Sequence, residues 1–121
     1  MYFYVIMPFR SDQSSTIKRK IIEDIAQEYR LVAHFPEYSP DRPSFNVKAA
    51  ILVLSNADFV IVDLSLERPS CYYELGLAEA LKRPVYLIAK AGTDIHQTAN
   101  RDKAFFFEDF AEFEDIVRTI L

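Results

Sequence analysis

Short, almost wholly apolar runs alternate with longer amphipathic segments along the chain. The apolar runs occupy residues 2–7, 31–35, 58–64, 84–89 and 104–107. Short continuous runs of this kind are typical of strands that are buried on both faces. In the other segments apolar positions recur at helical spacing, which predicts helices. These segments are residues 16–29, 46–56, 71–81 and 108–121, whereas the polar residues 95–103 fit either a short helix or a loop.

The alternation of strands and helices predicts the fold class. Strands that each lead into a helix form a parallel sheet with helices on both faces. Because crossovers between parallel strands are right-handed, we expect a three-layer, doubly wound (flavodoxin-like) α/β sandwich. Its sheet should have five mainly parallel strands in the order 2-1-3-4-5. A length of 121 residues suits one domain with its own core, so the expected domain spans residues 1–121.

The apolar stripes also predict which helical side chains face the sheet. For the first helix these are Ile17, Ile21, Ile22, Ile25 and Tyr29. Ser14 or Ser15 would cap that helix at its N-terminus. The inward positions expected in the second and last helices are Val47, Ala50, Ile51, Leu54, Phe110, Phe113, Val117 and Leu121.

The stretch from residue 63 to residue 83 concentrates the candidate chemistry. Asp63 ends the most strand-like run, and the chain then turns through Pro69 into a helix. The apolar or small positions of that helix are Cys71, Leu75, Ala78 and Leu81. Glu74 lies beside this stripe, so its carboxylate should face the sheet or a cleft at the carboxyl end, where Asp63 lies and open α/β sheets bind ligands. The alternative is that Glu74 is an ordinary first-turn acid that complements the helix dipole.

Three further residues have more than one interpretation. Arg10 follows the first strand, where free backbone N–H groups at the start of a helix could bind an anion; alternatively, Arg10 and the nearby serines form a solvated loop and a cap. Cys71 could be a nucleophile, because a helix N-terminus lowers the pKa of a thiol, but a buried structural cysteine is the preferred interpretation. His34 is interpreted as a strand residue, because no second metal-type ligand stands near it in the sequence. We therefore expect no metal site.

Composition excludes several classes of function. The net charge of -4 argues against binding to a nucleic-acid backbone. With a single cysteine the chain cannot form an intrachain disulfide, and it fits a reducing, cytoplasmic compartment. Gly76 and Gly92 are the only glycines, so the glycine-rich phosphate loops of P-loop and dinucleotide-binding proteins are absent from the sequence. No apolar run reaches the length of a membrane span, and we expect no signal peptide.

Four motifs occur in a fixed order along most of the chain. They are VIMPF at residues 5–9, ADFVIVDLS at 57–65, YELGLAEAL at 73–81 and Pro84-Val85. This set resembles the nucleoside 2-deoxyribosyltransferase-like superfamily, which includes deoxynucleoside 5′-monophosphate N-glycosidases and borders on the TIR-like domains. The YELG motif after an acid-ending strand is its more specific part.

The resemblance implies cleavage of the N-glycosidic bond between a deoxyribose and a base, without a cofactor. The substrate would be a small-molecule nucleoside or nucleotide. Glu74 matches the nucleophilic glutamate of the family, and Asp63 matches the acid that contacts sugar hydroxyls. Ser70 roughly matches a polar residue that helps to hold phosphate or sugar. Phe9, Arg10 and Ser11 of the first loop complete the expected substrate-binding set.

Two departures from the family pattern support an alternative function. The first loop reads Pro8-Phe9-Arg10-Ser11, where the family often has a small pair that leaves room for the ligand. No acid occurs between Asp41 and Asp58, although many members carry one there. The alternative is a non-catalytic nucleotide-sensing or TIR-like signalling domain on the same scaffold.

The aromatic content predicts self-association. Ten Phe and seven Tyr are many for a chain of this length. A small sandwich has little room to bury Tyr72, Tyr73 and the run at 105–107, and exposed apolar patches usually mark contacts. We therefore expect a homodimer or a higher symmetric oligomer, in keeping with family members that complete each site with a residue from a neighbouring subunit.

Overall fold

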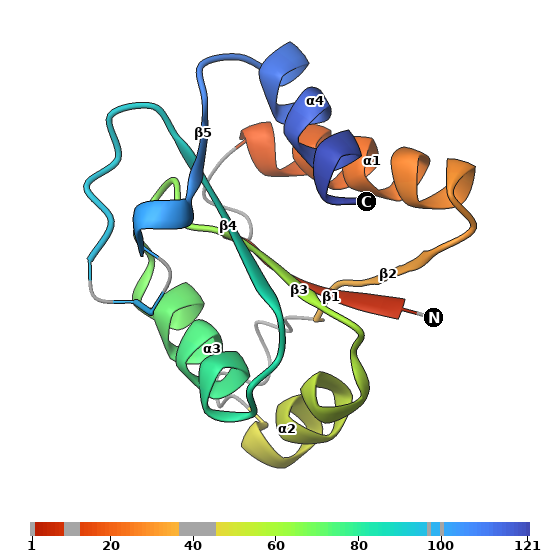
Figure 1. The fold of residues 1–121 in the computed structure, drawn as a ribbon, viewed down its shortest axis with the longest axis vertical. Coiled ribbons are helices and arrows are strands. Elements are labelled where there is room, and N and C mark those ends of the chain that lie inside the picture. The colour runs from red at the N-terminus through yellow and green to blue at the C-terminus, as the bar shows by residue number, and fades with distance from the viewer. Residues whose placement is uncertain (1, 9–12, 37–45, 97, 100) are drawn as a thin grey trace.

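A computed structural model shows the fold of this chain and describes residues 2–8, 13–36, 46–96, 98–99 and 101–121. Its strands are β1 (Tyr2–Ile6), β2 (Val32–His34), β3 (Val60–Asp63), β4 (Val85–Lys90) and β5 (Phe105–Phe107). They form one sheet in the order β2-β1-β3-β4-β5, and every neighbouring pair is parallel (Figure 1). The predicted doubly wound order is therefore confirmed.

Helices cover both faces of the sheet. They are α1 (Gln13–Glu28), α2 (Val47–Asn56), α3 (Pro69–Ala80) and α4 (Phe110–Ile120), with a short 3-10 turn η1 (Arg101–Lys103) before β5. Figure 1 shows α1 and α4 together on one face and α2 and α3 together on the other. We call these pairs the α1/α4 layer and the α2/α3 layer.

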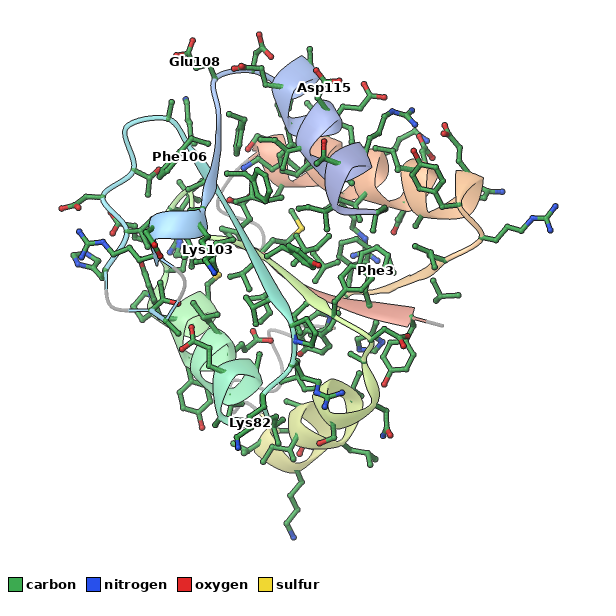
Figure 2. All side chains as sticks on the ribbon, in the orientation of Figure 1. Phe3, Lys82, Lys103, Phe106, Glu108 and Asp115 are labelled. Carbon is green, nitrogen blue, oxygen red and sulfur yellow. The ribbon has the colours of Figure 1, made fainter. Side chains whose placement is uncertain are left out.

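Alternate side chains of each strand supply two separate cores. Phe3, Ile61 and Ile88 pack with α1 and α4, and Phe3 is seen between the sheet and that layer in Figure 2. Tyr4, Val62 and Leu87 point the opposite way and pack with α2 and α3. Consecutive strand residues face opposite sides of a sheet, so neighbouring positions of one strand serve different layers.

The inward face of α1 differs from its prediction. The helix begins at Gln13, so Ser14 and Ser15 lie inside it and do not precede it as caps. Ile22 and Ile25 are buried as expected, but Ile17 is 47% exposed and Tyr29 is also largely exposed. The stripe instead includes Lys18, whose burial the sequence pattern did not predict.

The helices α2 and α4 also expose one predicted core residue each. Ala50 and Leu54 of α2 are buried, whereas Ile51 is partly exposed. Phe113 and Val117 of α4 are buried, whereas Phe110 in the first turn is not. Asn46 and Asp109 begin these two helices, and each side chain accepts a hydrogen bond from a backbone N–H three residues later.

Candidate active site

Glu74 lies in the second turn of α3 and points toward the sheet. The helix starts at Pro69, whose fixed backbone suits the first helical position. The Glu74 side chain is 9% exposed, and its Oε2 accepts a 2.9 Å hydrogen bond from the Tyr4 hydroxyl of β1. This is the inward orientation that its position beside the apolar stripe predicted.

Burial dominates the electrostatics of this pair. It raises the pKa of Glu74 above its usual value, and the hydrogen bond from Tyr4 offsets part of that rise. The pKa of Tyr4 is also raised, first by burial and then by the negative charge of Glu74. Tyr4 therefore stays protonated and remains a donor to the carboxylate.

His34 extends this arrangement to the edge of the sheet. It lies opposite Tyr4 in the β1–β2 pairing, and the two rings stack with centroids 5.4 Å apart. Neither residue was predicted from the sequence to lie close to Glu74. The strand alternation that places Tyr2 and Tyr4 on one face was the available signal, but it does not show which helix covers that face.

Asp63 has a different environment. Its Oδ2 accepts a 2.8 Å hydrogen bond from the Nζ of Lys18 in α1, and both side chains are almost fully buried. Its Oδ1 accepts hydrogen bonds from the backbone N–H and the hydroxyl of Ser65. Asp63 thus turns toward the α1/α4 layer, whereas Glu74 belongs to the α2/α3 layer.

The two acids were expected at the same end of the sheet, but they lie on opposite faces. Asp63 is at the end of β3, whereas Glu74 bonds to Tyr4 in the middle of β1. No hydrogen bond between described residues joins them. Cys71 lies within electrostatic reach of both: burial, followed by the charges of Glu74 and Asp63, raises its pKa to about 12. Cys71 is also buried, and burial without activation favours the interpretation of a structural cysteine.

The other expected site residues divide into two groups. Ser70 is exposed and lies one helical turn before Glu74, so the two share a face of α3. Arg68 begins α3 and makes no side-chain cap, and its carbonyl oxygen accepts from the backbone N–H groups of Cys71 and Tyr72. Phe9, Arg10 and Ser11 lie outside the described residues.

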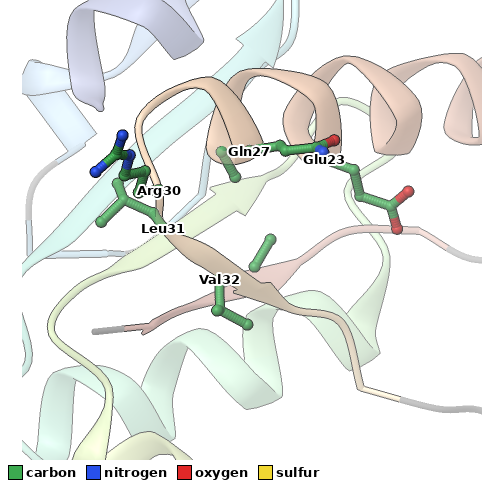
Figure 3. A pocket seen from close by; sticks show the side chains of 7 residues that line it. Glu23, Gln27, Arg30, Leu31 and Val32 are labelled. Atoms are coloured by element: carbon green, nitrogen blue, oxygen red, sulfur yellow. The ribbon is translucent and has the colours of Figure 1, made fainter.

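A hollow of about 440 Å³ lies elsewhere, between the end of α1 and β2 (Figure 3). Glu23, Gln27, Arg30 and Val32 are among the residues that line it, and it includes none of the expected site residues. Across the described ranges no cluster of three or more His, Cys, Asp or Glu is suited to hold a metal ion. Among the helices described above, none has both the length and the apolar character needed to cross a membrane.

Neither a family model nor a curated protein sequence matches the chain. Solved structures match its fold. The CMP N-glycosidase BcmB of Clostridium botulinum has a TM-score of 0.75 at 12% identity, and the match covers 100% of both chains. A 2-deoxyribosyltransferase from Bacillus psychrosaccharolyticus has a TM-score of 0.59 at 19% identity, over 95% of this chain and 91% of that one.

The TIR domains of the activated Roq1 resistosome are also similar. Their TM-score is 0.57 at 10% identity, and the match covers 98% of this chain and 82% of that chain. At these identities a structural likeness establishes the fold. The fold is shared with an N-glycosidase, a deoxyribosyltransferase and TIR domains, the proteins to which the motifs pointed, and it is the fold expected from the resemblance to the nucleoside 2-deoxyribosyltransferase-like superfamily.

Proposed function

We propose that this chain cleaves the N-glycosidic bond of a nucleoside or nucleotide, by hydrolysis or by transfer of the base. The observation that carries the proposal is the buried Glu74 carboxylate held by the Tyr4 hydroxyl. A buried acid with a raised pKa is typical of a functional site. The shared fold with a CMP N-glycosidase and a 2-deoxyribosyltransferase supports this reaction class.

In the proposed mechanism, Glu74 acts on the anomeric carbon. Departure of the base with the bonding electron pair leaves positive charge on the sugar ring, and a close carboxylate captures or stabilises it. Tyr4 holds Oε2, so Oε1 is the oxygen directed at the sugar. Water or a second base then displaces Glu74 from the anomeric carbon and restores the free carboxylate.

The remaining candidates would bind the substrate. Asp63 would orient the sugar through a hydroxyl group. Ser70, at the uncapped start of α3, would hold a 5′-phosphate together with Arg10, as anions favour helix N-termini. Phe9 and Ser11 would complete the substrate-binding loop.

We also propose that the chain forms a homodimer through the α2/α3 layer. Leu52 of α2 is 66% exposed and Tyr73 of α3 is 53% exposed. Gly76 of α3, three residues after Tyr73, is also exposed and has open space around it. A largely uncharged, apolar surface is best covered by a similar surface, and a second copy supplies one by two-fold symmetry.

A second candidate function is nucleotide sensing without catalysis. The likeness to the TIR domains of the Roq1 resistosome favours it, as does the unusual first loop, Pro8-Phe9-Arg10-Ser11. In that case the same site would bind a nucleotide and release no base. The two functions differ in one measurable product, the free base.

The decisive experiment incubates the protein with nucleosides, ribonucleotides, deoxynucleotides and NAD and measures free base by chromatography. Glu74→Gln keeps the shape of the side chain and removes its charge. We expect it to lower kcat by about 10³-fold or more while substrate binding persists, because transition-state stabilisation is lost. The exposed pair member Glu23 gives the matched control, Glu23→Gln, which should leave turnover unchanged.

Two results would contradict the enzyme proposal. If the wild-type protein binds a nucleotide tightly and releases no base from any compound, the sensing function replaces it. If base is released and Glu74→Gln retains full turnover, then Glu74 is not the nucleophile.

A further inference from the structure

Lys18 is a lysine in an unusual place. Its side chain is 4% exposed, although lysine is almost never fully buried unless it is paired. It lies in the second turn of α1 and points to the carboxyl end of β3. The ammonium group therefore lies inside the core, at the end of the sheet where doubly wound folds bind ligands.

The surroundings of Lys18 fix its ammonium group from several elements. The Nζ atom is 2.8 Å from Asp63 Oδ2. It also lies 4.9 Å from the ring centroid of Phe107 in β5 and 5.8 Å from that of Phe113 in α4. Both distances are within the range of a cation–π interaction. Three elements besides α1 thus converge on one positive charge.

The Asp63 carboxylate has nearly all of its acceptor sites occupied. An ionised carboxylate has about four lone-pair sites. Within the described part of the chain, Lys18 donates to Oδ2, and Ser65 donates twice to Oδ1. The Ser65 hydroxyl in turn accepts from the backbone N–H of Lys90 in β4. Among the described residues, the remaining lone pair of Oδ2 has no donor.

We propose that Lys18 is a positioning residue of this site: it holds Asp63 as an acceptor-only carboxylate whose remaining lone pair takes a ring hydroxyl of the substrate sugar. This inference rests on the proposed function and specifies its substrate. The preferred substrate carries a free hydroxyl on the sugar ring, and analogues that lack this hydroxyl bind more weakly.

A purely structural role explains the pair less well. A buried ion pair can often be replaced by apolar residues of similar volume without loss of stability. The α1/α4 layer already has an apolar core that includes Ile22, Phe113 and Val117. It is also joined by the ion pair between Arg118 of α4 and Glu28 of α1. The position of the pair at the ligand-binding end of the sheet is what a role in substrate orientation explains.

The test compares substrates that differ in the hydroxyl alone. The compounds are cytidine 5′-monophosphate and its 2′-deoxy and 2′,3′-dideoxy analogues, and the readouts are base release and calorimetric binding. The variants are Lys18→Met, Lys18→Arg and the doubly neutral Lys18→Met/Asp63→Asn, which removes both charges and guards against simple unfolding. Lys20→Met, on the exposed side of the same helix, is the matched control.

The proposal predicts a loss that depends on the hydroxyl. A hydrogen bond to a charged group corresponds to roughly 10- to 100-fold in affinity. Lys18→Met and the double variant should lose that factor in kcat/KM or affinity for hydroxyl-bearing compounds and change little for the dideoxy analogue. Lys18→Arg should recover part of the preference, and Lys20→Met should keep all of it.

Other outcomes overturn the inference. Equal losses on all three compounds, or a folded double variant with the full preference, would show that the pair is only structural. A wild-type protein that binds these nucleotides without any preference would refute it as well. If the wild-type protein binds with the expected preference, loses it in Lys18→Met and releases no base, the inference stands while the proposed reaction fails.

Discussion

The two helical layers flank one sheet, yet each holds its buried acid in a different way. In the α2/α3 layer, Glu74 rests against the neutral hydroxyl of Tyr4. In the α1/α4 layer, Asp63 rests against the ammonium group of Lys18. A neutral donor leaves the charge of a buried carboxylate only partly compensated, whereas a cation with further donors compensates it well. The arrangement of Glu74 suits the reactive role proposed for it, and the arrangement of Asp63 suits a carboxylate with a fixed orientation.

The outer surfaces of the two layers also differ in their charged groups. The α1/α4 layer carries ion pairs such as Arg19–Glu23, Lys20–Asp24 and Arg118–Glu28. Figure 2 shows Asp115 beside α4 and Glu108 in the loop that precedes this helix. The α2/α3 layer exposes apolar side chains, including Leu52 and Tyr73. The α1/α4 layer also exposes Ile17 and Phe110, so the two surfaces differ in their ion pairs more than in their exposed apolar side chains.

The largest effect should come from removing the charge of each acid in turn. Asp63→Asn leaves the Lys18 ammonium buried without its counter-ion, so we expect a loss of about 3–5 kcal/mol in the free energy of unfolding. Glu74→Gln should have the opposite sign at neutral pH, because it removes a carboxylate whose ionisation is disfavoured by burial. Urea titrations of both variants at pH 7 measure the two changes in the free energy of unfolding. Equal destabilisation by the two substitutions would contradict the predicted difference between the acids.

The pH dependence of the Glu74→Gln effect follows from the same shift. The folded protein raises the pKa of Glu74 above its ordinary value of 4.5. The folded state therefore binds the proton more tightly than the unfolded state. The free energy of unfolding falls as the pH rises through the interval between 4.5 and the raised pKa of Glu74 in the folded protein. The advantage of Glu74→Gln should appear above this interval and disappear below it. A constant difference between the two proteins at every pH would contradict this account.

A smaller effect should come from Tyr4→Phe, which keeps the ring and removes the hydroxyl. The hydrogen bond from Tyr4 lowers the pKa of Glu74, so its removal should raise that pKa further. The proposed mechanism needs the ionised carboxylate. As the pH is lowered, the variant should therefore lose activity at a higher pH than the wild-type protein does. We expect the acid limb of the kcat/KM profile to move upward and neutral-pH activity to fall roughly 10-fold. A profile that keeps its acid limb would show that Tyr4 does not tune Glu74.

The smallest effect on folding should come from changing the outer surface. Leu52→Glu places a charge on the exposed apolar side of α2. We expect it to convert a dimer to a monomer in light scattering across a range of concentrations, while the free energy of unfolding of the monomer changes by less than about 0.5 kcal/mol. Thr119→Glu, on the exposed side of α4, is the control that should leave assembly unchanged. A wild-type protein that is monomeric at all concentrations would refute the proposed interface.

Local sequence patterns were enough to predict the fold. Each buried strand appears as an apolar run, and the regular alternation with helices leaves few topologies with right-handed crossovers. The phase of α1 was the main error, because apolar residues alone were counted. Ile17 and Tyr29 face outward, while Lys18 lies in the inner stripe, where its aliphatic stem packs like an apolar side chain.

The site was predictable only in part, for a related reason. Spacing within α3 was sufficient to place Glu74 inward, because a helix fixes the directions of its side chains over one or two turns. The partners of the acids come from distant segments. Tyr4 is 70 positions from Glu74, and Lys18 is 45 positions from Asp63. Tyr4 was hidden in an apolar run, and Lys18 was not among the inward positions predicted for the first helix, so neither gave a local signal.

The long separation between Tyr4 and Glu74 has a consequence for the order of folding. Contacts between distant segments require the closure of a long loop and tend to form late. The hydrogen bond between β1 and α3 exists only after β3 has paired with β1 and α3 has docked on the sheet. Partly folded chains therefore contain Glu74 without its hydrogen bond from Tyr4, and the pair forms only when the first strand and the third helix meet in the folded domain.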